Sequence, residues 1–193
     1  MKQTRQAAQE ETKERILVAG QELFTAGWYD EVTLRAVAAS AGVALQTLVN
    51  HFGTKANLAA SLVERVGGRI DSRRDAVLAG DAAGAVAVLV DEYERVGDAI
   101  VRMLALEQRV EEMTALLSQG RRVHRAWVER VFVDALRAAR GAERTRRTAT
   151  LVAVTDVLTW KLLRRDQGLS RRATQEAMSE MVRALTTAAG TAP

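Results

Sequence analysis

The chain has 193 residues and no cysteine, which excludes a disulfide framework and thiolate metal sites. Its one proline is Pro193, and long alternating apolar runs are absent, so the composition predicts an all-α protein. No apolar run approaches the roughly 18 residues that a membrane span needs. Residues 1–15 are polar and lack the apolar stretch of a signal peptide, and we therefore expect a cytoplasmic protein with no membrane partner.

The first third of the sequence predicts a group of short helices. Apolar residues at helical spacing indicate a helix from about Glu10 to Ala26. Two shorter apolar stripes follow within residues 33–52, and Gly42 and Val43 separate them. Two short helices joined by a tight glycine turn are typical of a helix-turn-helix, which places its second helix in the major groove of DNA.

The rest of the sequence continues the helical pattern. Thr54 is expected to cap a fourth helix from Lys55 to about Leu78, and the segment 80–84 breaks the pattern after it. The later helices are expected in this order: one after Gly84, one or two short ones within 106–117, and longer ones near 121–140, 144–166 and 171–188. Gly120 is expected to separate two of them, and Ser170 to cap the last.

Net charge does not locate the DNA-binding region. The chain carries a formal charge of +4, yet residues 1–66 hold seven basic and seven acidic side chains. The functional prediction therefore depends on the motif and its spacing.

The segment TLRAVAASAGVALQTLVNHFGTK, residues 33–55, resembles the helix-turn-helix of the TetR family of transcriptional regulators. The positions that match the family pattern are Thr33, Ala38, Ala41, Gly42, Val43, Thr47, Leu48, His51, Phe52, Lys55 and Leu58. Two positions depart from it, because Ala44 replaces the usual serine and Val49 the usual aromatic residue. Both replacements remove side-chain groups that the family uses near phosphate. The resemblance implies a three-helix DNA-binding head over residues 8–66, with the helix-turn-helix at about 33–52. It implies a C-terminal regulatory domain over residues 67–193 that binds a ligand and dimerises.

The polar residues of the recognition helix are the candidate base readers. Gln46 and Asn50 lie four residues apart on one face, and each amide can bond adenine with two hydrogen bonds. Thr47 is expected to contact a phosphate or a thymine methyl group, and Lys55 to bind a phosphate. His51 either contacts DNA or orients the head. The DNA-binding set predicted in full is Thr33, Leu34, Gln46, Thr47, Asn50, His51 and Lys55.

The C-terminal half is predicted to contain the dimer interface and the ligand pocket. By resemblance, two long helices pack against a second copy, and the interface residues predicted are Val123, Val131, Leu151, Val154, Leu158 and Leu162. Apolar and aromatic residues suit an adaptable pocket, and the lining predicted is Tyr93, Met103, Leu106, Met113, Leu117, Trp127 and Trp160. His124 and Asp156 are further polar candidates. In both sets, the alternative is that the residues form the core of the domain itself.

The sequence therefore predicts a ligand-responsive transcriptional regulator. The most favoured function is a repressor that binds a palindromic operator as a homodimer and is released by a small molecule. The alternative is a helical interaction module with weak or no specific DNA binding. An enzyme is not expected, because the chain has two histidines and shows neither a phosphate-binding glycine loop nor a metal cluster. No cofactor and no metal are expected. Gly67 and Gly68 interrupt the fourth helix and are interpreted either as a hinge or as a simple kink.

Overall fold

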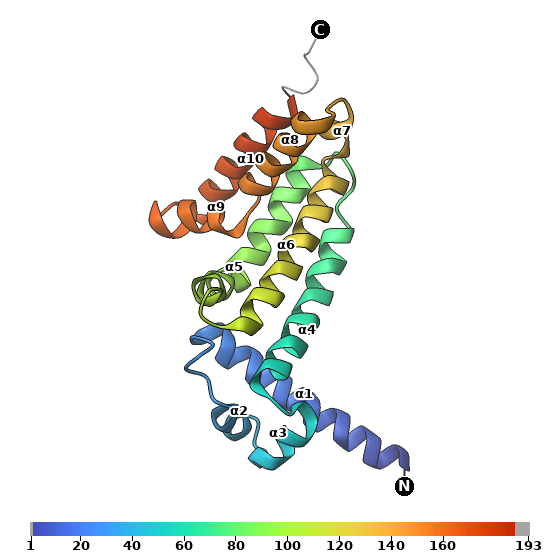
Figure 1. Cartoon of the computed structure of the whole chain (residues 1–193), viewed down its shortest axis with the longest axis vertical. Helices are drawn as coiled ribbons and strands as arrows, with labels where there is room; N and C mark the ends of the chain where they lie inside the picture. Colours follow the sequence, from blue (N-terminus) through green and yellow to red (C-terminus); the bar gives the residue numbers. More distant parts are fainter. Residues whose placement is uncertain (1, 188–193) are drawn as a thin grey trace. The chain divides into compact units, whose positions relative to one another are not determined.

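The computed structural model describes the backbone of residues 2–187, and the side chains of residues 6–187 except 69, 71 and 112. All regular structure within this range is helical, as the composition predicts. The chain forms two compact units, one ending at Arg69 and one beginning at Ile70, and each is described by itself (Figure 1). No helix among the described residues has the length and apolar character needed to cross a bilayer.

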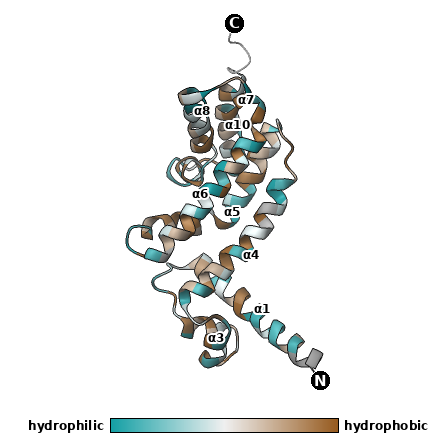
Figure 2. Ribbon diagram, turned by 45° about the vertical axis from the view of Figure 1, so that its right-hand side comes forward, coloured by the Kyte–Doolittle hydropathy of each residue, from teal (hydrophilic) through white to brown (hydrophobic). Residues whose placement is uncertain are grey.

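The first unit is built from four helices around one small core. These are α1 (Lys2–Ala26), α2 (Leu34–Ser40), α3 (Leu45–Phe52) and the first part of α4 (Lys55–Asp75). The helix α1 begins at Lys2, earlier than expected, and its side chains from residue 6 to 11 are exposed. Figure 2 shows this outer part as largely hydrophilic. Core side chains come from all four helices and from residues flanking α2: Ile16, Leu17, Ala19, Val32, Val37, Ala38, Ala41, Leu48, Phe52, Leu58 and Leu62.

The second unit is a helical bundle arranged around α5 (Ala82–Leu106). This helix packs against α6 (Glu111–Val131), α9 (Val157–Lys161) and α10 (Arg171–Thr187). The unit is completed by the end of α4, by α7 (Val133–Arg137), by α8 (Gly141–Val154) and by a π-helix, η1 (Leu162–Asp166). Figure 1 shows α5, α6 and α10 running along the length of this bundle.

Helix boundaries in this unit differ from the prediction at Gly120, at Phe132, which separates α6 from α7, and after Val154. Gly120 lies inside α6 and does not end it, because one glycine costs a helix only about 1 kcal/mol. The helix expected over 144–166 instead breaks after Val154. There the Thr155 hydroxyl donates to the Leu151 carbonyl at 2.7 Å, and the Asp156 carboxylate accepts the Leu158 N–H at 2.8 Å. These side chains compete with the backbone for hydrogen bonds, and Asp156 starts the new helix α9.

Trp160 is the largest fully buried side chain of the bundle. It packs directly on Gly97 of α5, where a β-carbon would lie 2.6 Å from its Cζ3 atom. Its indole N–H donates to Glu94 at 3.1 Å, and its ring lies 6.0 Å from that of Tyr93. The absence of a side chain at Gly97 therefore lets α9 approach α5 closely.

Candidate nucleic-acid interface

Local backbone chemistry shapes the turn between α2 and α3. The Thr33 hydroxyl caps α2 by accepting the Ala36 N–H at 3.1 Å. Gly42 then takes a φ of +64°, a left-handed conformation that favours glycine. The Val43 N–H donates back to the Ala38 carbonyl at 3.0 Å, which closes the turn. The predicted helix-turn-helix is therefore present, with its glycine where the turn requires it.

The helix α3 is held by its apolar face and exposes its polar face. Leu48 and Phe52 are buried in the core of the unit. Gln46 and Asn50 are exposed on the opposite side, one turn apart. Their side chains are bonded to each other, since the Gln46 Nε2 donates to the Asn50 Oδ1 at 2.9 Å. The two amides predicted to read bases thus share one exposed face and one hydrogen bond.

Four other residues of the predicted DNA-binding set, on or next to α2 and α3, are half-buried or make contacts within the unit. Thr47 and His51 are half-buried, and the His51 ring lies 6.2 Å from that of Phe52. Leu34 packs partly against the core, and the Thr33 hydroxyl already serves as the helix cap. Leu34 and Thr33 therefore hold the motif together through these contacts.

The structure corrects the prediction that Lys55 binds a phosphate, because its ammonium group is engaged within the unit. Its Nζ donates to the carbonyl oxygens of Tyr29 at 2.8 Å and Val32 at 3.0 Å, with a longer contact to Asp30 at 3.4 Å. It also lies 4.5 Å from the centre of the Tyr29 ring. An ammonium has three donors, and three carbonyls occupy them here. Lys55 therefore fastens the loop before α2 to the start of α4, which leaves it no spare donor for a phosphate.

Three further features bear on DNA contact. Ala44 occupies the N-cap of α3 and makes no side-chain cap, so the amides at that end lack a hydroxyl partner. Arg35 on α2 and Leu45 at the start of α3 are exposed, and the predicted set contained neither. Their positions off the buried stripes of the two helices are the sequence signal that would have identified them.

The second unit contains a buried polar cluster. Arg74, at the end of α4, makes a bidentate ion pair with Glu92 of α5, with N–O distances of 2.8 and 2.9 Å. A third Arg74 nitrogen lies 3.3 Å from Nδ1 of His124 on α6, and Nε2 of that ring lies 3.1 Å from the Thr155 hydroxyl. Tyr93 donates to the Thr155 carbonyl at 2.9 Å. All five side chains are buried.

The hydrogen bonds of this cluster fix the state of His124. A guanidinium only donates, so Nδ1 accepts from Arg74 and Nε2 carries the proton that goes to Thr155. Burial and the neighbouring Arg74 charge lower the pKa of His124 to about 4, so the ring is neutral at pH 7. Burial acts in the opposite direction on Asp156 and raises the pKa of that carboxyl.

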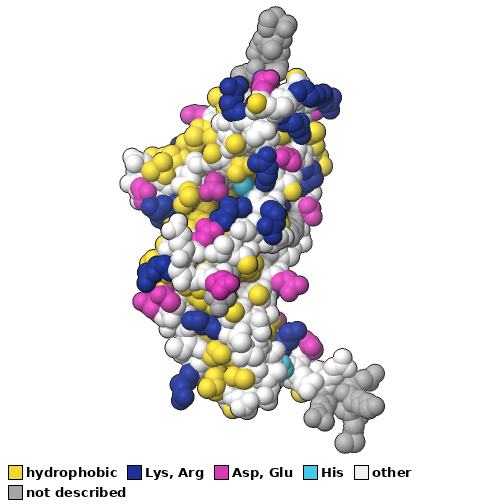
Figure 3. All heavy atoms as spheres, viewed as in Figure 1, with side chains coloured by type: hydrophobic (Ala, Val, Ile, Leu, Met, Phe, Trp, Pro, Cys, Tyr) yellow, Lys and Arg dark blue, Asp and Glu magenta, His cyan; other side chains and the backbone are white. Residues whose placement is uncertain are grey.

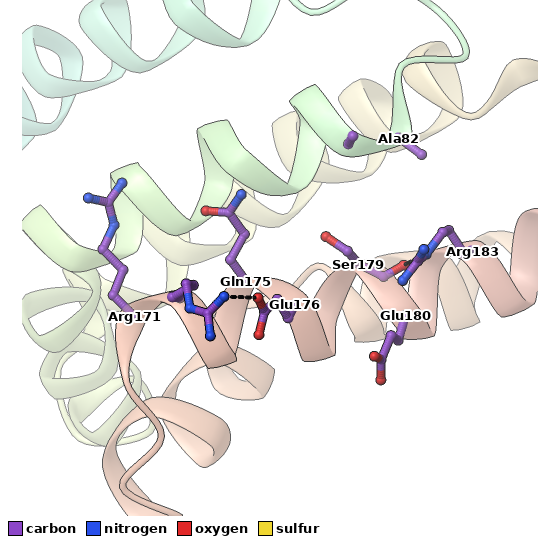
Figure 4. A pocket seen from close by; sticks show the side chains of 9 residues that line it. Ala82, Arg171, Gln175, Glu176, Ser179, Glu180 and Arg183 are labelled. Atoms are coloured by element: carbon purple, nitrogen blue, oxygen red, sulfur yellow. Dashed lines mark hydrogen bonds and ion pairs between the residues drawn. The ribbon is translucent and has the colours of Figure 1, made fainter.

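The predicted ligand-lining residues are mostly packed core. Tyr93, Trp127 and Trp160 belong to the main cluster of this unit, Leu106, Met113 and Leu117 are buried outside it, and Met103 is half-buried. A groove of about 520 Å³ opens instead between the start of α5 and one face of α10 (Figure 4). It is lined by Ala82, Ala83, Arg171, Arg172, Gln175, Glu176, Ser179, Glu180 and Arg183, and by none of the seven predicted residues. Arg172 and Glu176 form an ion pair of 3.0 Å on this face of α10, and in Figure 4 charged and polar side chains of α10 lie along the groove.

The predicted dimer residues divide into two groups. Val131 and Leu151 are fully buried in the core of their own unit, so the prediction is wrong for these two. Leu158 and Leu162 are 51% and 50% exposed, Val123 is 38% exposed, and Val154 is half-buried. Figure 3 shows apolar side chains reaching the surface in several places on this unit.

Known proteins resemble the chain in two ways. The sequence model of the bacterial regulatory proteins of the TetR family matches residues 16–62. The HTH-type transcriptional repressor KstR of Rhodococcus jostii is 46% identical over 66 residues, which are 34% of this chain and 31% of the repressor. The match thus spans about a third of that relative.

Solved structures share the fold over most of the chain. A transcriptional regulator from Rhodococcus sp. Rha1 has a TM-score of 0.73 at 17% identity, over 93% of this chain and 98% of that one. The SmeT–triclosan complex has a TM-score of 0.69 at 20% identity, over 90% of both chains. Residues 16–62, which contain the helix-turn-helix, are thus similar to the TetR family of bacterial regulatory proteins, and the solved structures show that the fold is shared over most of the chain.

Proposed function

We propose that the chain is a transcriptional repressor that binds a palindromic DNA operator as a homodimer and is released by a small molecule. The observation that carries this proposal is the exposed amide face of α3, with Gln46 and Asn50 held outward by the buried Leu48 and Phe52. Such a face fits the major groove, where glutamine and asparagine amides pair with base edges. Its action on DNA implies a cytoplasmic location and needs no enzymatic step.

Dimerisation follows from the geometry of helix-turn-helix binding. One recognition helix reads one half-site, and two-fold dimers place two such helices in successive grooves about 34–36 Å apart. The exposed Leu158 and Leu162, with Val123 and Val154, are the candidates that remain for the contact between copies.

Release by a ligand rests on likeness to relatives. The SmeT structure contains triclosan, and KstR is named a repressor. We propose that a small molecule binds in the second unit and opens space among its buried aromatic residues, for example at Trp127, where the polar cluster supplies partners for hydrogen bonds.

A mobility-shift assay on the DNA upstream of the gene tests the proposal. A shift of a defined palindrome that persists at moderate salt is expected, whereas non-specific binding falls steeply as salt rises. Gln46→Ala and Asn50→Ala are expected to abolish the sequence preference but to leave the salt-dependent non-specific binding. Wild-type binding with no sequence preference would instead favour a helical interaction module.

A further inference from the structure

Arg35 is the only residue with a formal charge in the helix-turn-helix. Residues 33–52 contain no lysine, no acidic side chain and no other arginine, and the larger segment 1–66 has seven basic and seven acidic side chains. Affinity for DNA depends strongly on cations that neutralise phosphates. Because the motif has so little charge, this contribution must come from few side chains, and Arg35 is the first candidate among them.

The surroundings of Arg35 leave its guanidinium group available to a partner. The residue lies in the first turn of α2, and its side chain is exposed. Within the described part of the chain, no hydrogen bond or ion pair engages this guanidinium. The other exposed residues of α2, Ala36, Ala39 and Ser40, are small, while Val37 is buried in the core. The exposed face of α2 therefore offers one cation on a surface that a DNA strand can approach closely.

The docking geometry of a helix-turn-helix brings this face to the sugar–phosphate backbone. The second helix of the motif enters the major groove, while the first crosses the backbone. A guanidinium can bind a phosphate through two parallel N–H···O bonds. Lys55, the residue predicted for a phosphate, donates to the carbonyls of Tyr29 and Val32 instead. Arg35 thus has both the position and the free donors that Lys55 lacks.

We propose that Arg35 is the residue of the helix-turn-helix that binds a DNA phosphate, in place of Lys55. The inference rests on the proposed function, because it requires α3 to lie in the major groove. Such a contact positions the head on the duplex and carries no sequence information, which comes from the polar face of α3. In a homodimer two copies of Arg35 act, one at each half-site.

The salt dependence of operator binding by the full chain tests the inference. Each phosphate contact contributes about 0.9 to the slope of log affinity against log salt concentration. Arg35→Gln loses one contact per head and should lower the magnitude of this slope by about 1.8 for the dimer. A fourfold rise in salt should then weaken the wild-type complex about 12-fold more than the complex of the variant. Arg35→Lys keeps the charge and should keep the wild-type slope.

Two matched variants each remove one positive charge elsewhere in the same unit. Arg15→Gln changes an exposed arginine of α1, outside the motif, and Lys55→Met changes the lysine that is engaged within the unit. Both should keep the wild-type slope, the second at a temperature at which circular dichroism shows it to be folded. Arg35→Gln should keep the wild-type melting temperature and should select the wild-type site from random DNA, because a phosphate contact does not read sequence.

The outcomes separate this inference from the proposed function. If the wild-type chain selects a palindrome but the slope of Arg35→Gln falls no more than the slopes of the two matched variants, the inference is wrong and the proposed function stands. A changed base preference in Arg35→Gln would make Arg35 a reader of bases and would also overturn the inference. If the wild-type chain binds duplex DNA without sequence preference and the slope falls in Arg35→Gln alone, the phosphate contact stands and the palindromic repressor falls.

Discussion

Mild acid should destabilise the second unit through the single buried histidine His124. Burial and Arg74 lower its pKa from an ordinary 6.5 to about 4 in the folded protein. Below pH 6.5 the unfolded chain therefore binds a proton that the folded chain does not take up until about pH 4. The unfolded state binds more protons in this window, so stability is lost as the pH falls through it. Above pH 6.5 His124 is neutral in both the folded and the unfolded state, so it adds no pH dependence to the stability.

The size of the effect follows from the pKa difference. The free energy of unfolding falls by about 1.4 kcal/mol for each pH unit within the window, so acidification from pH 6.5 to pH 4 lowers it by about 3 kcal/mol. His124→Gln offers a matched comparison that does not titrate. Its amide oxygen can accept from Arg74 and its N–H can donate to Thr155, as the imidazole does at 3.3 and 3.1 Å. Carboxylates that titrate in the same range are common to both proteins and cancel in the difference.

Urea unfolding at several pH values between 7 and 4 measures this difference. The indoles of Trp127, which stacks at 6.0 Å on His124, and of Trp160 make fluorescence a suitable signal for this unit. The wild-type chain should lose about 3 kcal/mol more than the variant. The chain has two histidines, so an NMR titration assigned with the variant gives the pKa of His124 directly. Equal losses in the two proteins, or titration of folded His124 near pH 6.5, would refute the reasoning.

Three further predictions concern packing and capping. Gly97→Ala should destabilise the chain by about 1–3 kcal/mol, because the new methyl group overlaps Trp160, whereas Gly120→Ala, with open space around it, should stabilise α6 by up to about 1 kcal/mol. The urea midpoints of the two variants are each compared with that of the wild-type chain, and equal shifts would contradict the close contact between Gly97 and Trp160. Lys55→Met should cost about 1–2 kcal/mol by leaving carbonyl oxygens without their donor, and an unchanged melting temperature would show that the contacts are dispensable. Ala44→Ser should add about 1 kcal/mol by capping α3, seen as a higher melting temperature, and a lower one would argue against the cap.

The helix-turn-helix could be predicted from sequence because its signals are local. Helical spacing gave α2 and α3, and a glycine between them matched the backbone that the turn requires, with Gly42 at a φ of +64°. The exposed side of α3, with Gln46 and Asn50, followed from the same spacing.

The features that sequence reasoning missed depend on partners far along the chain. Nothing near Lys55 in the sequence shows that the carbonyls of Tyr29 and Val32 converge on its ammonium. An apolar stripe shows which residues share a face of a helix and not what covers that face. Leu151 and Leu158 therefore looked alike, although one is buried and the other is 51% exposed.

The helix α4 has a consequence for building chimeric regulators. Lys55 at its first residue is tied to the loop before α2 in the first unit, and Arg74 near its last is paired with Glu92 in the core of the second. Both anchors have their partners within their own unit, so a junction placed between them keeps each contact on one side of the join. Exchanging heads between relatives thus requires more than matching sequence ends. The join in α4 is best placed between Lys55 and Arg74, so that each unit keeps its own anchor.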